Sequence, residues 1–143
     1  MSESILIQDM PKYFWIIKIF FPAADPARVI ITFADKIYTR GQLSPDLWEH
    51  EKTHNRQQKF SKWYATWWWI KYIVSRRFRF SQELEAYRIQ YKFALNNYSR
   101  NQAFDILRRI AEELSGPLYN RLVSYERAEA MIRHDRAYDK WND

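Results

Sequence analysis

Cysteine is absent from this chain of 143 residues, and glycine occurs only twice. Without cysteine the chain forms no disulfide and offers no thiolate to a metal, so any metal site has to use histidine and carboxylate ligands. Sheet-rich folds need many tight turns, in which glycine is a usual residue, so the scarcity of glycine favours helices joined by short connections. We expect an α+β fold, mostly helical, forming a single domain over residues 1–143 with a small β-hairpin or sheet.

Long hydrophobic runs are also missing. The two most apolar segments, FWIIKIFFPAA and WWWIKYIV, are interrupted by Lys18 and Lys71. Both are shorter than the roughly 20 residues that a transmembrane helix needs. The segment MSESILIQDM lacks the basic and apolar regions of a signal peptide. We therefore expect no transmembrane segment and a cytoplasmic location.

Aromatic residues and positive charge, in contrast, are plentiful. Aromatic residues make up 18% of the chain, and the formal net charge is +6. That charge permits a weak, salt-sensitive attraction to nucleic acid or anionic lipid. The basic residues are spread along the chain, apart from a cluster at Arg76, Arg77 and Arg79. A solvated basic face is the favoured interpretation, and nucleic acid is not the expected partner.

Local patterns predict one hairpin and several helices. Residues 29–33 and 36–39 are rich in β-branched and aromatic side chains and flank Ala34-Asp35, which predicts a hairpin. Ser44-Pro45-Asp46 predicts a helix start with Ser44 as the cap, and the helix is expected to continue toward Tyr64. The other expectations are a loose arm over 1–12, a short helix or buried strand over 13–21, and helices starting near Ser81, near Asn101 and near 118.

Two histidines stand four positions apart in LWEHEKTHNRQQ, residues 47–58. Residues at i and i+4 of a helix share one face, so His50 and His54 can bind one metal ion. Glu51 lies about 100° further round the helix, where its carboxylate can reach a water on that metal. This is the arrangement of the H-E-x-x-H zinc helix, which has two ligands and one general base. The alternative is a chance pattern on a solvated helix.

A catalytic zinc ion needs a third protein ligand and an open position for water. The segment FRFSQELEAYRIQ, residues 78–90, offers Glu83 or Glu85. His134 is a more distant alternative. Zinc is the default metal for two histidines and one carboxylate with an open position.

The string HEKTHNRQQ, followed by ELEAYRIQ, resembles the gluzincin class of zinc metallopeptidases. It is similar in particular to minimal-domain gluzincins and to bacterial and phage proteins with a H-E-x-x-H-x-x-Q-Q helix and a later E-x-E-A helix. The resemblance covers roughly residues 28–95 and implies a zincin-like domain. It also implies that His50, His54 and Glu83 bind Zn²⁺, with Glu85 as the fallback ligand.

The same resemblance implies a role for two further residues. Glu51 would be the catalytic base and acid in the hydrolysis of a protein or peptide substrate. Tyr87 stands where relatives with a Glu-x-x-x-Asp pattern have an aspartate that orients a ligand histidine. The donor that stabilises the oxyanion is open among four candidates: Tyr87, Tyr91, Tyr119 and His134.

Two other functions remain as alternatives. One is a zinc-binding interaction protein without proteolytic activity, and the other is a basic, aromatic-rich module that binds nucleic acid or a membrane surface. Carboxylates in the tail at 137–143 are a possible cover over the metal. The oligomeric state is left open.

Overall fold

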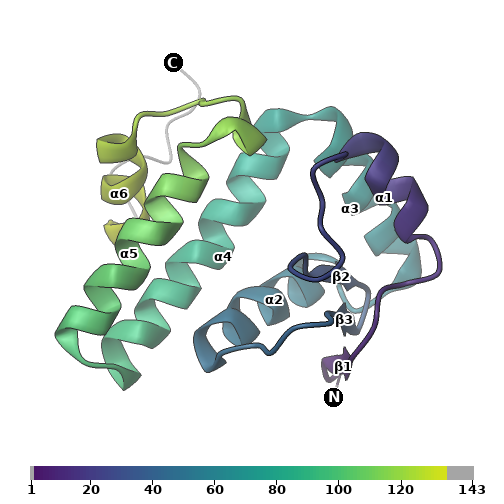
Figure 1. Cartoon of the computed structure of the whole chain (residues 1–143), viewed down its shortest axis with the longest axis horizontal. Coiled ribbons are helices and arrows are strands. Elements are labelled where there is room, and N and C mark those ends of the chain that lie inside the picture. Colours follow the sequence, from purple (N-terminus) through teal and green to yellow (C-terminus); the bar gives the residue numbers. More distant parts are fainter. Residues whose placement is uncertain (1, 135–143) are drawn as a thin grey trace. The chain divides into compact units, whose positions relative to one another are not determined.

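The computed structural model describes residues 2–134, which form helices and one small sheet (Figure 1). The expected mostly helical α+β fold is confirmed. The chain divides into two compact units, Met1–Val74 and Ser75–Asp143. The single domain over residues 1–143 stays a prediction, and the tail at 137–143 lies outside the described residues. Among the helices of residues 2–134, none is both long and apolar enough to cross a bilayer.

The first unit contains a three-stranded sheet in the order β1-β3-β2. Strand β2 (Ile31–Phe33) runs antiparallel to β3 (Lys36–Tyr38), with Thr32 opposite Ile37, so the predicted hairpin is confirmed. Strand β1 (Ile5–Ile7) lies parallel to β3. The expectation of a loose arm over residues 1–12 was therefore wrong for Ile5–Ile7. The paired residues lie some thirty positions apart in the sequence, so no local pattern predicts this pairing.

Three helices complete the first unit. Residues 13–21 were expected to form a short helix or a buried strand, and they contain helix α1 (Phe14–Phe20). Helix α2 (Pro45–Gln57) begins after Ser44 as expected, although the Ser44 side chain makes no capping hydrogen bond. The expected continuation of α2 toward Tyr64 was wrong. Lys59 and Phe60 both have φ of 53°, a left-handed conformation that ends an α-helix, and α3 (Lys62–Val74) follows.

The second unit is built from helices alone within its described residues. They are α4 (Arg76–Asn97), α5 (Arg100–Leu114), the 3₁₀ helix η1 (Pro117–Tyr119) and α6 (Tyr125–Arg133). Helix α4 begins before the expected Ser81, because the Ser75 hydroxyl caps it by accepting a hydrogen bond from the Phe78 N–H at 3.2 Å. Helix α5 begins where expected, at a capping box formed by Ser99 and Gln102.

The core of the second unit is formed by the inner faces of its helices. Phe80, Leu107, Leu114 and Met131 are fully buried there. The helix expected from residue 118 begins only at Tyr125, because η1 is followed by Asn120 with φ of 55°.

Candidate metal centre

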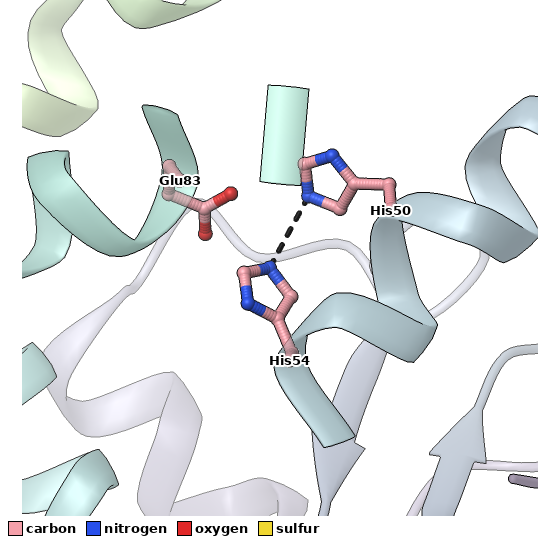
Figure 2. Close-up of side chains that lie close together, drawn as sticks. All are labelled: His50, His54 and Glu83. Carbon is pink, nitrogen blue, oxygen red and sulfur yellow. Dashed lines mark hydrogen bonds between the residues drawn. The ribbon is translucent and has the colours of Figure 1, made fainter. Parts of the chain in front are cut away.

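Helix α2 holds two buried imidazoles against each other. His50 and His54 are each 5% exposed, and their Nε2 atoms are 3.2 Å apart. The rings meet edge to face, with centroids 4.9 Å apart and an angle of 81° between their planes. Figure 2 shows the two nitrogens pointing toward each other. The i, i+4 spacing thus places both rings on one face of the helix, as the sequence predicted.

The distance between the two nitrogens matches a shared metal ion. Ligand nitrogens lie about 2.0–2.1 Å from zinc, so two of them in tetrahedral geometry are roughly 3.3–3.4 Å apart. The observed 3.2 Å is close to that value. Two neutral imidazoles in this arrangement can form one N–H···N hydrogen bond, in which one ring donates and the other accepts. Alternatively, both rings direct the lone pair of Nε2 at one cation.

Gln57 contacts the ring nitrogen of His54 that does not face His50. Its side-chain oxygen lies 2.9 Å from His54 Nδ1. An amide oxygen only accepts hydrogen bonds, so Nδ1 donates and Nε2 keeps its lone pair. Metal-binding histidines usually have such a partner on the nitrogen that does not bind the metal. The contact with Gln57 therefore favours the tautomer of His54 that a metal requires.

The carboxylate of Glu51 is buried and anchored to the sheet. It is 6% exposed, and its Oε2 accepts a hydrogen bond of 2.5 Å from the hydroxyl of Thr32 on β2. This bond holds one carboxylate oxygen and fixes the side-chain rotamer. A general base needs this kind of orientation, because proton transfer depends on its position.

Two amide side chains attach the end of α2 to the hairpin turn. The Ala34 N–H donates to Gln58 Oε1 at 2.7 Å, and Asn55 Nδ2 donates to the Ala34 carbonyl at 2.6 Å. Gln58 Nε2 also donates to the carbonyl of Thr32 at 3.0 Å. These bonds hold Ala34 at its unusual φ of 58°. They also fix the position of Thr32 relative to the helix that carries Glu51.

Helix α3 supplies an aromatic wall beside the histidines. The ring of Trp68 lies 5.4 Å from that of His54, and Trp68 in turn stacks on Tyr72 at 4.8 Å. Both aromatic residues are buried. An apolar wall at this position excludes water from one side of the imidazole pair and strengthens electrostatic interactions there.

The candidate third ligand is a buried carboxylate. Glu83, on α4, is 6% exposed, whereas the fallback Glu85 is exposed. The two are two positions apart on one helix and so face different directions. His50, His54 and Glu83 are all buried, and each offers a ligand atom that a metal ion accepts (Figure 2).

Tyr87 has a defined partner within the second unit. Its hydroxyl donates a hydrogen bond of 2.8 Å to Glu113 on α5. Burial raises the pKa of Tyr87 well above its ordinary value, and the nearby Tyr119 and carboxylates raise it further. Tyr87 also lines a cavity of about 430 Å³ beside Arg109. Its role next to a ligand histidine stays a prediction.

The other candidate oxyanion donors differ in exposure. Tyr119 is buried in the second unit, whereas His134 is exposed at the end of α6. Tyr91 is half-buried and packs against the core of that unit. The choice of the oxyanion donor stays open among these residues and Tyr87.

Sequence reasoning missed several residues that organise this centre. Thr32 was expected only as part of a strand, and nothing in the hairpin pattern singles it out as the partner of Glu51. The roles of Asn55 and Gln58 could not be predicted from local patterns, because both amides form hydrogen bonds with backbone atoms of Ala34, in a turn more than twenty positions away. A usable signal was the pair Asn55 and Gln58, two polar residues three positions apart and so on one helix face, which should otherwise be apolar if it packs on a sheet.

The chain has no significant match among protein-family models, curated proteins or solved structures. The function is therefore inferred from the chemistry of the site itself.

Proposed function

We propose that this chain is a zinc-dependent metallopeptidase of gluzincin type that hydrolyses a protein or peptide substrate in the cytoplasm. His50, His54 and Glu83 are the proposed ligands of Zn²⁺, and Glu51 is the proposed general base and acid. The observation that carries this proposal is the separation of 3.2 Å between the two buried Nε2 atoms on the helix that also bears Glu51.

The donor set fits zinc. Two imidazoles and one carboxylate are a usual ligand set for catalytic zinc, and they leave one position open. The hydrogen bond from His54 to Gln57 orients one ligand. Zinc, when bound, acts as a Lewis acid that lowers the pKa of water and polarises a peptide carbonyl.

In this proposal, residues of the chain carry out the proton transfers of the hydrolysis. In hydrolysis the oxygen of water bonds to the carbonyl carbon, the C–N bond breaks, and a proton is delivered to the leaving amine. Glu51 takes a proton from the water and passes it to the amine nitrogen. The Thr32 hydroxyl keeps the Glu51 carboxylate in one orientation during both transfers.

Metal content tests the ligand set. We expect about one zinc per chain in the purified wild type, measured by elemental analysis. His50→Ala and Glu83→Gln should lose most of it, whereas the matched control Glu85→Gln should keep it. Full zinc content in Glu83→Gln, with loss in Glu85→Gln, would assign the third ligand to Glu85 instead. The same low content in every variant and in the wild type would refute the metal site.

Cleavage tests the reaction. We expect the wild type to degrade an unfolded protein such as reduced casein, and a chelator to stop it. Glu51→Gln should bind as much zinc as the wild type but cleave about 10²–10⁴-fold more slowly. A wild type that binds zinc stoichiometrically but cleaves none of a panel of unfolded proteins would contradict the peptidase. It would leave a zinc-binding interaction protein as the better account.

A further inference from the structure

Helix α3 has two apolar faces, and only one of them is buried. Ala65, Trp68 and Tyr72 pack into the first unit. A second stripe is exposed and consists of Trp63 (68% exposed), Trp67 (49%), Ile70 (44%) and Val74 (75%). At about 100° per residue these four positions fall within roughly 60° of arc, on the side of the helix opposite the buried face. We call them the α3 stripe.

Helix α1 adds more exposed apolar surface in the same unit. It contacts α3 through Phe21 at its end, whose ring lies 6.3 Å from that of Tyr72. On α1, Trp15 and Ile19 are each more than half exposed. Single exposed apolar residues are ordinary in proteins, but a continuous stripe of four along one helix marks a binding surface.

The charges of these helices indicate what binds there. The sequences of α1 and α3, FWIIKIF and KWYATWWWIKYIV, contain three lysines and no aspartate or glutamate. Lys18 and Lys62 are exposed. A second copy of the chain would bring lysines to face lysines, which is unfavourable. An anionic surface would instead complement them.

Tryptophan with lysine is the combination that suits the boundary of a lipid bilayer. Indole rings prefer the headgroup level, and lysine stems extend along apolar surface while the ammonium reaches the phosphates. A helix with one exposed apolar stripe lies in the plane of that boundary and binds more strongly where the lipids are anionic. We propose that the α3 stripe docks this protein on an anionic membrane surface.

This docking is independent of the proposed metal site, and the test separates the two. The full-length protein is sedimented with phosphatidylcholine vesicles that either contain or lack phosphatidylserine. We expect binding to the anionic vesicles at low salt, with a blue shift of tryptophan emission, and weaker binding as salt is raised. His50→Ala should bind these vesicles as the wild type does, whatever happens to its zinc.

Two surface variants identify the docking surface. Trp63→Ser with Trp67→Ser should weaken vesicle binding by roughly tenfold or more. Lys62→Gln should weaken it about fivefold, because one lysine near an anionic surface is worth about that much. The matched control is Leu95→Ser with Phe104→Ser, which removes two equally exposed apolar side chains of the second unit. It should bind as the wild type does, and circular dichroism checks that all variants are folded.

Four outcomes would overturn the proposal. They are no binding to either kind of vesicle, equal binding to neutral and anionic vesicles, unchanged binding by the folded tryptophan variant, and equal weakening by the matched control. Dimerisation in sedimentation that disappears in the tryptophan variant, without vesicle binding, would assign the stripe to a second copy of the chain.

Discussion

Replacing Gln58 by alanine should destabilise the first unit more than any ordinary surface substitution. The side chain is fully buried and makes two hydrogen bonds to the hairpin. The two bonds are not equivalent. The Thr32 carbonyl keeps a second donor, Trp69 Nε1 at 3.0 Å, whereas the buried Ala34 N–H loses the acceptor that Gln58 provides.

The expected magnitude follows from that difference. A buried donor left without a partner costs about 1–3 kcal/mol. The cavity left by the missing side-chain atoms adds roughly 1 kcal/mol. We therefore expect the free energy of unfolding to fall by about 2–4 kcal/mol.

Urea denaturation followed by tryptophan fluorescence is the appropriate assay. Six of the seven tryptophans belong to Met1–Val74, so emission reports mainly on the unit that contains Gln58. The matched control is Gln8→Ala, the same change at an exposed position of that unit, which should alter stability by less than about 0.5 kcal/mol. A loss in Gln58→Ala no larger than in the control would refute the anchoring of the turn by α2.

Three further predictions follow from single contacts. Thr32→Val should keep its zinc but lower kcat/KM by about 10–100-fold, because the hydroxyl no longer orients Glu51; peptide cleavage with parallel metal analysis measures this. Gln57→Leu should weaken zinc binding by about 10–100-fold, because the ring of His54 loses its partner; competition with a chromogenic chelator measures this. Above pH 10 the unfolded chain ionises Tyr87 while the folded chain, with its raised pKa, does not, so the free energy of unfolding should fall by up to about 1.4 kcal/mol per pH unit. Urea unfolding followed by circular dichroism at pH 9 and 11 measures this, and Tyr87→Phe should show a flatter pH dependence.

Each of these predictions has a result that contradicts it. Loss of zinc in Thr32→Val would mean that the hydroxyl supports the ligands rather than the base. Unchanged affinity in Gln57→Leu would mean that the tautomer of His54 is fixed by another group. Equal pH dependence in the wild type and Tyr87→Phe would show that a different group titrates.

The sequence allowed the prediction of those parts of the site that depend on local spacing. The H-E-x-x-H pattern placed His50 and His54 on one helical face, because that relation depends only on helical periodicity. The hairpin before the helix was predictable from its β-branched residues and its two-residue turn. These features need no knowledge of the rest of the fold.

Other features depended on contacts between distant segments or on unusual backbone. Strand β1 was missed because its partner β3 lies far along the chain. The end of α2 was missed because Lys59 and Phe60 are left-handed without being glycine, so the residue types do not mark the turn. Local backbone hydrogen bonds close it, from the Lys59 N–H to the Arg56 carbonyl and from the Phe60 N–H to the Asn55 carbonyl, both at 2.9 Å. The anchoring of Glu51 by Thr32 likewise arises only when the hairpin packs on the helix.

The arrangement around Thr32 also bears on how the sheet avoids unwanted association. Strand β2 is at one edge of the β1-β3-β2 sheet, and an unprotected edge strand is a template on which another chain can add a strand. On β2 the Thr32 carbonyl is already occupied by donors from Gln58 and Trp69. The side chains that hold the candidate centre together thus also block one backbone acceptor of this edge, which opposes aggregation through strand addition.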